Sequence, residues 1–260
     1  MAKKARLIDA TKCMGCKGCQ VACKQWNQLP AVQTEFVGSY ENPADMDPNT
    51  WGRVKFNEYE NGDSINWYMN FFSCMHCTDA GCLNICPVDA IVRMENGAVR
   101  IDQETCIACG ACRGACPFEI PRISDAAYKC TFCADRQAQN MAPACASACP
   151  TGAITFGDRD DMLAAAEARV SALQDRGKTN AQVYGKDELD GLMVIYVLAD
   201  SPDKYGLPVD PQVSFSAYLW KLAMRPVRTV ATVGLAVGAL SSWFTLRKAE
   251  VEKEKEEAKL

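Results

Sequence analysis

Sixteen cysteines fall into four blocks of four along this chain of 260 residues, with none left over. The blocks are Cys13, Cys16, Cys19 and Cys23; Cys74, Cys77, Cys82 and Cys86; Cys106, Cys109, Cys112 and Cys116; and Cys130, Cys133, Cys145 and Cys149. Blocks one and three have the spacing Cys-x2-Cys-x2-Cys-x3-Cys, in which three thiolates hold one iron–sulfur cubane and the fourth reaches a neighbouring cluster. The last cysteines of blocks two, three and four are each followed by a proline, as in ferredoxins: Pro87, Pro117 and Pro150. The pattern predicts four [4Fe-4S] clusters.

Two other uses of the cysteines are less consistent with this pattern. A disulfide framework requires an oxidising compartment and typically a small domain, whereas residues 1–10 have no apolar signal core and 260 residues can bury a core without cross-links. Structural zinc would suit block four taken alone, because four thiolates complete a tetrahedral site. Blocks one and three carry a third cysteine at x2 spacing, which zinc does not need, so the four blocks together favour clusters.

Loop lengths indicate which blocks share clusters. Only residues 87–105 separate blocks two and three, which is the length of one hairpin, so these blocks are expected to form one contiguous domain. Blocks one and four must then pair with each other. The ligand-sharing rule predicts four sets: Cys13, Cys16, Cys19 and Cys149; Cys23, Cys130, Cys133 and Cys145; Cys74, Cys77, Cys82 and Cys116; Cys86, Cys106, Cys109 and Cys112.

Short strands and one helix are expected around the blocks. An Asn-Gly pair at residues 96–97 predicts a hairpin over Ala90–Asp102, and a second hairpin is expected about Asn61-Gly62. The return arm of the second hairpin carries four aromatic residues that are expected in the core: Trp67, Tyr68, Phe71 and Phe72. Further strands are expected at Arg6–Asp9, Glu119–Ile123 and Ala153–Phe156, and an amphipathic helix at Asp160–Arg176, ended by Gly177.

The predicted fold class is α+β, with two ferredoxin-like domains that each carry two clusters and a single C-terminal transmembrane helix. Blocks one and four would form the first domain from residues 1–29 and 125–185, with an insertion at 30–73 that contains a hairpin. Blocks two and three would form the second domain, 74–124. The remainder is expected to be a connecting segment (186–214), the anchor helix (215–248) and a charged tail (249–260).

The anchor prediction rests on Thr229–Leu246, which is uncharged over eighteen residues, or about 27 Å of helix, just enough to cross a bilayer core. Trp220 and Trp243 lie where interfacial aromatic residues are common. Gly234 and Gly238 offer a smooth face to a second transmembrane helix. Five Lys or Arg residues follow the span and three precede it, which mildly favours a cytoplasmic C terminus.

Composition excludes several functions. A net charge of −4 gives no electrostatic basis for binding nucleic acid, and no Gly-rich phosphate loop is present. The only histidine, His76, limits general-base chemistry. It lies between Cys74 and Cys77, but every cluster already has four thiolates, so it is not expected to be a ligand. No catalytic residue is therefore assigned.

Five cations lie beside the cysteines in the sequence: Lys12, Lys17, Lys24, Arg113 and Lys129. A cubane with four thiolates is an anion, so a nearby cation favours its reduced state and raises its potential. If these side chains are exposed, solvent and salt screen their charge and they are ordinary surface residues. The sequence leaves both readings open.

Stretches outside the cysteines suggest a family. They include Leu7-Ile-Asp9, Glu41-Asn-Pro-Ala-Asp45, Cys74-Met-His-Cys77, Ile120-Pro-Arg122, Tyr128-Lys-Cys-Thr131 and Tyr205-Gly-Leu-Pro208. With the cysteine blocks, they make the chain similar to the iron–sulfur beta subunit of respiratory, membrane-bound formate dehydrogenase, from Ala5 to about Pro226 and again at the C-terminal span. The cysteine blocks alone would fit many beta subunits of molybdopterin oxidoreductases.

The resemblance implies an electron relay within a hetero-oligomer. Its partners would be a catalytic alpha subunit, which oxidises formate at a molybdenum or tungsten bis-pterin guanine dinucleotide centre, and a membrane cytochrome b gamma subunit that passes electrons to quinone. The cluster of Cys13 would lie nearest the catalytic subunit and that of Cys86 nearest the haem. The family's usual placement puts the cluster domains on the outer face of the cytoplasmic membrane and the C terminus inside.

Two alternatives stay open at this point. One is the equivalent four-cluster beta subunit of another complex, such as a hydrogenase, a polysulfide reductase or a dimethyl sulfoxide reductase. The other is a free polyferredoxin carrier. A diffusing carrier gains nothing from the apolar region between Trp220 and Leu246, so this region favours a subunit of a membrane complex.

Overall fold

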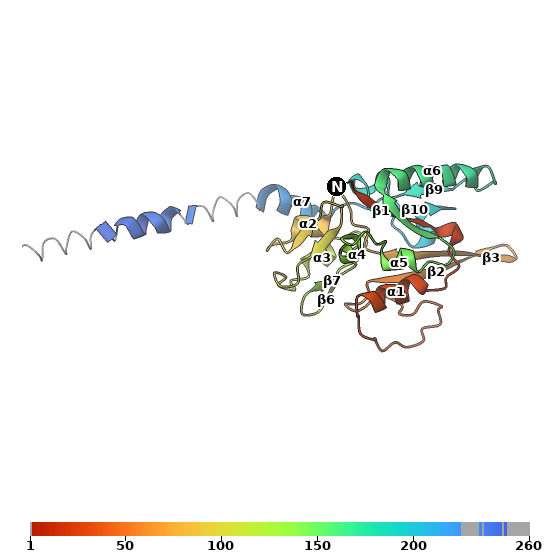
Figure 1. Cartoon of the computed structure of the whole chain (residues 1–260), viewed down its shortest axis with the longest axis horizontal. Coiled ribbons are helices and arrows are strands. Elements are labelled where there is room, and N and C mark those ends of the chain that lie inside the picture. The colour runs from red at the N-terminus through yellow and green to blue at the C-terminus, as the bar shows by residue number, and fades with distance from the viewer. Residues whose placement is uncertain (1, 225–233, 236, 246, 249–260) are drawn as a thin grey trace, which may run out of the picture. The chain divides into compact units, whose positions relative to one another are not determined.

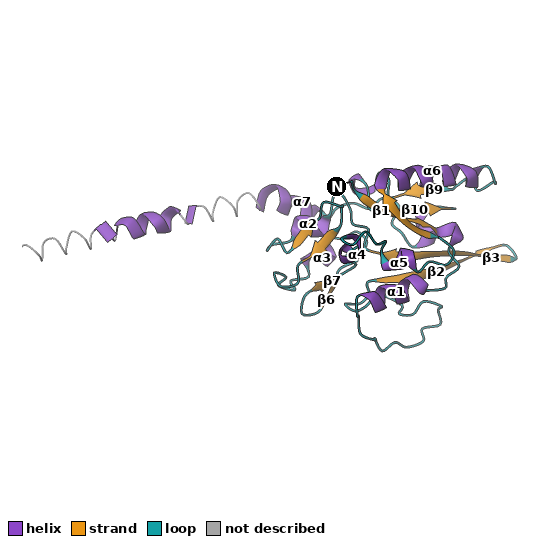
Figure 2. Ribbon diagram, in the orientation of Figure 1, coloured by secondary structure: helices purple, strands orange, loops and turns teal. Residues whose placement is uncertain are grey.

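The computed structural model describes residues 2–224, 234–235, 237–245 and 247–248. The chain divides into two compact units, residues 1–214 and 215–260, and each is described by itself. All sixteen cysteines belong to the first unit. Most of its strands and short helices are labelled in Figure 1, and all are coloured by type in Figure 2.

A four-stranded sheet organises the first unit. The strands lie in the order β8 (Ile154–Asp158), β1 (Lys4–Asp9), β10 (Val194–Leu198) and β9 (Gln182–Tyr184). Strand β1 is parallel to β10 and antiparallel to β8, and β9 is antiparallel to β10. The sheet therefore joins the strand before block one to the strand after block four.

The two faces of this sheet have different neighbours. Helix α6 (Arg159–Gln174) covers one face, where Leu173 and Leu7 belong to the same small core (Figure 1). Because successive side chains of a strand point to opposite faces, Arg6 and Ile8 of β1 point away from α6. Ile8 belongs to the larger core that contains most of the buried cysteines. One charged side chain, that of Arg6, is thus turned toward the cysteines.

Short helices carry or follow the cysteine turns. They are α1 (Gly18–Trp26), α2 (Gly81–Ile85), α3 (Ala111–Gly114), α4 (Ala134–Gln137) and α5 (Ala144–Ser147). Helix α1 packs against α5, and α2 packs against α3. This packing joins block one to block four and block two to block three. Two short hairpins complete this region: β4 (Ile91–Arg93) with β5 (Val99–Ile101), and β6 (Arg122–Ile123) with β7 (Ala127–Tyr128).

A long hairpin follows block one and is formed by β2 (Gly52–Asn61) and β3 (Ser64–Ser73), which pair along their whole length. Along β3 the residues nearest the turn are exposed, whereas the last four are buried. Phe71 and Phe72 are therefore core residues as predicted, but Trp67 is exposed because it lies in the half of the strand that extends away from the core.

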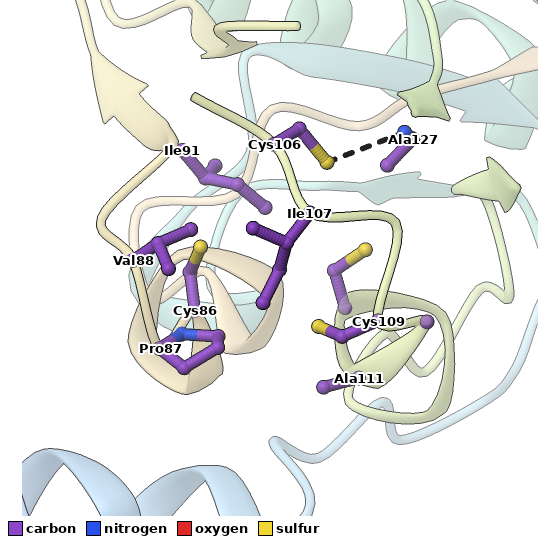
Figure 3. A pocket seen from close by; sticks show the side chains of 11 residues that line it. Cys86, Pro87, Val88, Ile91, Cys106, Ile107, Cys109, Ala111 and Ala127 are labelled. Carbon is purple, nitrogen blue, oxygen red and sulfur yellow. Dashed lines mark hydrogen bonds between the residues drawn. The ribbon is translucent and has the colours of Figure 1, made fainter. Parts of the chain in front are cut away.

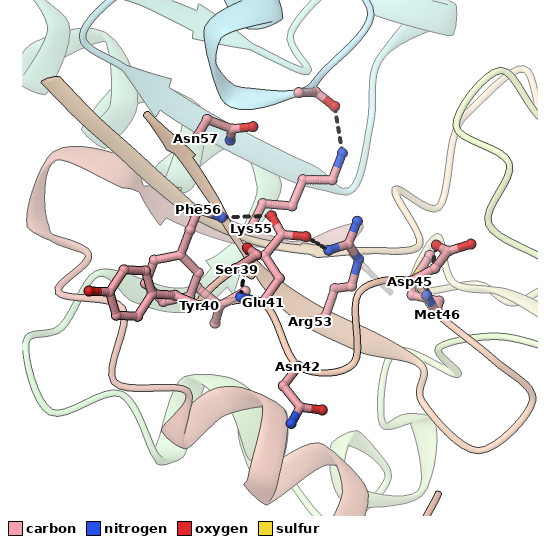
Figure 4. Close-up of polar contacts among 12 residues, drawn as sticks. Ser39, Tyr40, Glu41, Asn42, Asp45, Met46, Arg53, Lys55, Phe56 and Asn57 are labelled. Carbon is pink, nitrogen blue, oxygen red and sulfur yellow. Dashed lines mark hydrogen bonds and ion pairs between the residues drawn. The ribbon is translucent and has the colours of Figure 1, made fainter. Parts of the chain in front are cut away.

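The loop before this hairpin is fixed by two acidic residues (Figure 4). Glu41 accepts a hydrogen bond of 2.8 Å from the backbone N–H of Phe56 and forms an ion pair with Arg53. Asp45 accepts two hydrogen bonds of 2.7 Å from Arg122, which lies after block three. Two of the sequence stretches that suggested a family are thereby joined, because Asp45 ends one and Arg122 ends the other.

Several sequence predictions are confirmed and two need correction. Both Asn-Gly hairpins and the helix after block four are present. The strand expected over Glu119–Ile123 is wrong in extent, because only Arg122–Ile123 is extended: Glu119 has a φ of 52° and Pro121 has no N–H to donate. Residues 186–214, expected only to connect, also supply β10, whose five residues are all buried. Strand β9 was missed as well.

Two 3-10 turns flank β10, Glu188–Asp190 before it and Pro202–Tyr205 after it, and a third at Ala10–Lys12 leads into block one. The second unit begins with α7 (Phe215–Leu219), a π-helical turn (Trp220–Met224) and helical residues at 234–235, 237–245 and 247–248. The predicted span Thr229–Leu246 lies partly outside the described residues, which omit 229–233, 236 and 246. Within those described, no helix combines the length and apolarity needed to cross a membrane.

Candidate metal centres

All four cysteine blocks have a left-handed residue at the same position of the turn. The residue before the second cysteine has a positive φ in each block: Gly15 (68°), His76 (49°), Ala108 (53°) and Phe132 (62°). A left-handed residue between right-handed or extended neighbours turns successive backbone N–H groups inward, which makes a concavity suited to an anion. In block four the N–H of Phe132 donates a hydrogen bond of 3.4 Å to the Cys130 Sγ. The repeated turn is therefore a local feature of the spacing, shared by blocks with different side chains.

The first outer site lies between blocks two and three. One cavity is lined by the thiols of Cys86, Cys106, Cys109 and Cys112 and by apolar side chains that include Val88, Ile91 and Ile107 (Figure 3). The Cys106 Sγ accepts a hydrogen bond of 3.4 Å from the N–H of Ala127. Four thiols around an apolar hollow can hold a cubane, and this is one complete predicted set.

The second outer site lies between blocks one and four. A second cavity is lined by Cys13, Cys16, Cys19 and Cys149, with Ile8, Val54 and Phe71 as apolar walls. At Cys149 burial favours the neutral thiol, but hydrogen bonds from the N–H of Ile154 at 3.4 Å and from Thr151 outweigh it, so its pKa is lowered. This thiol is the one brought from the far end of the cysteine region.

Two inner sites lie within the core. Burial raises the pKa of Cys23, and the neighbouring thiolates of Cys130, Cys145 and Cys133 raise it further. Likewise burial raises the pKa of Cys77, with Cys74, Cys116 and Cys82 adding to the effect. The structure thus gathers the members of both remaining predicted sets. Among the residues described, no three His, Cys, Asp or Glu side chains come close enough to hold one metal ion. The thiolates of a cubane bind four different iron atoms and stand farther apart.

Neighbouring thiols connect the four sites in one order, with the two inner sites between the two outer ones. Burial raises the pKa of Cys19 in one outer site, with Cys145 of an inner site as the next cause. The two inner sites meet at Cys130, whose raised pKa reflects burial first and also the thiolate of Cys74. Burial and then Cys82 raise the pKa of Cys112, in the other outer site, to about 12. Exposure follows this order, because Cys16 and Cys109 of the outer sites are exposed, whereas seven of the eight inner thiols are buried and Cys116 is half-buried.

The five cations singled out from the sequence are placed differently. Lys12 and Arg113 are exposed, and Lys17 and Lys24 are half-buried and bonded to the backbone carbonyls of Tyr40 and Asn49. Lys129 alone is buried, and its Nζ donates to the carbonyl oxygen of Val99. Burial would lower the pKa of Lys129, but the thiolates of Cys74, Cys82 and Cys130 raise it above its ordinary value.

Sequence reasoning missed a sixth cation, Arg6. Its side chain is fully buried, and its guanidinium donates to the Cys145 Sγ at 3.2 Å and to the Ser73 hydroxyl. The guanidinium also lies 5.3 Å from the centre of the Phe71 ring. The available signal was a charged residue, Arg6, on the same face of the strand as the apolar Ile8.

Arg6 and Lys129 allow a test of whether the site suits an anionic group. Within the part of the chain that the structure describes, neither forms an ion pair with a carboxylate. A buried charge without a partner destabilises a protein by about 3–5 kcal/mol. Both cations lie against cysteines, so thiolate-ligated clusters, which are anions, supply the missing negative charge. The residues present therefore fit iron–sulfur clusters.

Comparison with known families and proteins agrees with this chemistry. Two family profiles, both described as a 4Fe-4S dicluster domain, match residues 12–90 and 65–159. Together they include every cysteine of the four blocks. The chain therefore contains two 4Fe-4S dicluster domains with mixed helix and strand, and its sixteen cysteines hold four [4Fe-4S] clusters.

Individual relatives are similar over most of the chain. The formate dehydrogenase iron-sulfur subunit of Haemophilus influenzae is 44% identical over 93% of this chain and 80% of its own length. The nitrate-inducible formate dehydrogenase iron-sulfur subunit of Escherichia coli is 43% identical over 92% of this chain and 84% of its own. The formate dehydrogenase 2 subunit beta (cytochrome c-553) of Nitratidesulfovibrio vulgaris is 38% identical over 78% of this chain and 96% of its own.

Proposed function

This chain belongs to the iron–sulfur subunits of formate dehydrogenase, and we propose that it relays electrons one at a time along a line of four [4Fe-4S] clusters. It is an electron-transfer subunit and not the formate-oxidising one. When bound, the clusters supply one-electron redox chemistry. We assign the ligands as Cys13, Cys16, Cys19 and Cys149 (cluster 1); Cys23, Cys130, Cys133 and Cys145 (cluster 2); Cys74, Cys77, Cys82 and Cys116 (cluster 3); and Cys86, Cys106, Cys109 and Cys112 (cluster 4). Clusters 1 and 2 would belong to residues 1–29 with 125–185, and clusters 3 and 4 to residues 74–124.

One observation carries the relay proposal: each outer site has one exposed thiol, Cys16 or Cys109, whereas no inner thiol is exposed and seven of the eight are buried. A relay needs its first and last carriers near the surface, where partners can approach, and its middle carriers shielded from other oxidants and reductants. Exposed apolar side chains flank the outer thiols, with Met14 61% exposed beside Cys16 and Ile107 59% exposed beside Cys109. Both ends of the line therefore offer contact surfaces for partner subunits.

The partners are assigned through the family. We propose that cluster 1 receives electrons from a catalytic subunit with a molybdenum or tungsten bis-pterin centre, and that cluster 4 delivers them to a membrane cytochrome b and quinone. Exposed Phe36, Val37 and Tyr40 in the loop after block one extend the apolar surface on the chain's cluster 1 domain. This supports a larger partner interface at the entry end.

The membrane proposal rests on the sequence of the second unit. We propose that residues 215–248 hold the complex in the cytoplasmic membrane, with the cluster domains on the outer face and the C terminus in the cytoplasm. The uncharged run Thr229–Leu246 and the flanking Trp220 and Trp243 support this placement. Among its described residues, Leu235, Val237, Leu240 and Phe244 are helical, apolar and exposed within this chain.

Purification of the native complex tests the function. It should oxidise formate with a dye acceptor, and this chain should contain about sixteen iron and about sixteen sulfide. The isolated, cluster-loaded chain should accept electrons from a reductant without oxidising formate. Stoichiometric zinc in place of iron would reject the cluster assignment, and formate oxidation by the single chain would reject the non-catalytic role.

Truncation after Lys221 tests the anchor. The shortened complex should leave washed membranes, still oxidise formate with a dye and transfer few electrons to quinone. Gly238→Leu is the milder variant, because its side chain would separate two packed transmembrane helices and weaken co-purification with the cytochrome subunit while all four clusters remain. A truncated complex that stays on the membrane and reduces quinone at the undeleted rate would refute the anchor.

A further inference from the structure

The two inner sites meet around a buried arginine. Arg6 donates to the Cys145 Sγ of the cluster 2 set at 3.2 Å, and its other Nη donates to Ser73, the residue directly before Cys74 of the cluster 3 set. The rings of Phe71 and Phe132 lie 5.3 and 6.0 Å from the guanidinium carbon. Arg6 is only 1% exposed, so its charge is fixed in position and shielded from water.

A buried lysine also lies at this junction. Lys129 directly precedes Cys130 of the cluster 2 set and donates to the carbonyl oxygens of Val99 and, at 3.4 Å, of Cys130. The thiolates that act on its ammonium most strongly are Cys74 and Cys82 of the cluster 3 set. Lys129 is 5% exposed. Each inner set thus has a buried cation against its thiols. Lys129 also lies near Cys130 of the cluster 2 set, and Arg6 also bonds to the residue before Cys74 of the cluster 3 set.

The third titratable group of the junction, His76, adds no charge. Its Nδ1 accepts a hydrogen bond of 3.0 Å from the N–H of Val99, so this nitrogen carries no proton. Burial lowers the pKa of His76, and Lys129 and Arg6 lower it further. The ring of His76 packs on Phe132 with 4.6 Å between centroids. The junction therefore holds two positive charges and a neutral imidazole.

We propose that Arg6 and Lys129 are the potential-setting residues of the inner clusters, Arg6 acting mainly on cluster 2 and Lys129 mainly on cluster 3. Reduction adds one negative charge to a cluster, and a fixed cation in a poorly screened interior favours that state. In the inner step one electron leaves cluster 2 and enters cluster 3, no bond breaks, and both cations keep their protons. The inference rests on the proposed relay and assigns control of its middle step to two named side chains.

Potentiometric titrations followed by electron paramagnetic resonance test this on the isolated, cluster-loaded chain. Arg6→Gln and Lys129→Met remove one charge each and approximately keep side-chain volume. Each should reduce, at least tenfold, the ratio of reduced to oxidised cluster at a fixed ambient potential, which is about 59 mV for one electron. The cluster that shifts most should differ between the two variants. Arg6→Lys and Lys129→Arg keep the charge and should shift the ratio less than threefold.

Arg113→Gln is the matched control, because Arg113 is also next to a ligand, Cys112, but is exposed. Solvent and salt screen its charge, so its removal should change the ratio less than threefold. In the unmodified isolated chain, where no partner covers Cys16 and Cys109, higher salt should also shift the outer potentials more than the inner ones. This measurement does not depend on a variant folding.

These outcomes distinguish a failure of the roles assigned to Arg6 and Lys129 from a failure of the proposed relay. Equal shifts in Arg113→Gln and Lys129→Met, or four unchanged potentials in both neutral variants, would overturn it while leaving a four-cluster relay intact. Inner potentials as sensitive to salt as the outer ones would also overturn it. Fewer than four clusters in the unmodified chain would instead reject the proposed function on which it rests.

Discussion

The outer and inner sites share one cysteine turn but differ in their surroundings. At the outer sites Cys16 and Cys109 are exposed, and the cavities have mostly apolar walls. At the inner sites the thiols are almost all buried, and Arg6 and Lys129 lie against them as unpaired cations of the described chain. Cysteine spacing therefore determines the local turn, whereas the burial and charge around each turn come from distant parts of the chain.

The largest difference is expected between cysteine substitutions at the two kinds of site. Cys145→Ser removes a buried ligand that also pairs with Arg6. It should therefore lower the free energy of unfolding by about 3–5 kcal/mol, in addition to the loss of cluster 2. We expect little folded protein. Cys109→Ser removes an exposed ligand and should leave three intact clusters in a folded chain. Folded yield and iron per chain measure both effects, and similar yields for the two variants would contradict the comparison.

A second effect is expected at the shared ligand of cluster 1. Cys149 lies far in sequence from Cys13, Cys16 and Cys19, but its thiol lines the same cavity. Cys149→Ser should therefore alter the spectrum of cluster 1 and leave cluster 2 unchanged, although Cys149 follows Cys145 in its own block. If instead only the cluster of Cys130, Cys133 and Cys145 is lost, the blocks do not exchange ligands.

The cysteine turns could be anticipated because their geometry is local. Three ligands within seven residues of block one must lie on one turn whatever surrounds them, and the Asn-Gly hairpins are equally local. Strand β10 could have been found, since residues 194–198 are a continuous apolar run of the kind that forms buried parallel strands, but its partner β1 is far away in sequence.

The roles of the cations could not be predicted from spacing. Arg6 is buried because β10 and β8 flank β1 and because Phe71, Phe132 and Cys145 pack around its side chain, and all of these come at least 65 residues later in the sequence. Lys129 was noticed only for being next to Cys130, as were four other cations beside cysteines. Exposure separates Lys129 from Lys12 and Arg113, and exposure is a property of the assembled fold.

A moderate effect is expected in the rate at which iron is lost. A polar iron chelator can reach the clusters through exposed thiolates at the outer sites, whereas the inner sites require local opening of the core. Iron release from the native chain should therefore have two phases, with about half of the iron, or about eight atoms, in the faster phase. Absorbance of the iron–chelator complex measures the rates. A single phase for all of the iron would show that the inner sites are no better protected.

The smallest effect compares the two outer turns with each other. Gly15 and Ala108 occupy the same place in their blocks, with φ of 68° and 53°, so the backbone alone does not require glycine at either. The long hairpin makes the difference, because a Cβ on Gly15 would lie 2.6 Å from a ring carbon of Phe56 and 2.7 Å from the Met69 sulfur. Ala108 carries its Cβ in the turn that lies beside an exposed Cys109.

Gly15→Ala should therefore destabilise the chain by about 2–4 kcal/mol, from overpacking together with the strain of a left-handed alanine. Ala108→Gly removes that strain but raises the conformational entropy of the unfolded chain. The two effects oppose each other, so the free energy of unfolding should change by no more than about 1 kcal/mol. Thermal unfolding of the cluster-loaded protein measures both, and the signal of cluster 1 should change only in Gly15→Ala. Phe56→Ala combined with Gly15→Ala should recover part of the loss, because it removes the ring that the new methyl group meets. If Gly15→Ala destabilises the chain no more than Ala108→Gly does, the long hairpin does not pack tightly against the first cysteine turn. The two ends of the relay would then be alike in packing as well as in cysteine spacing.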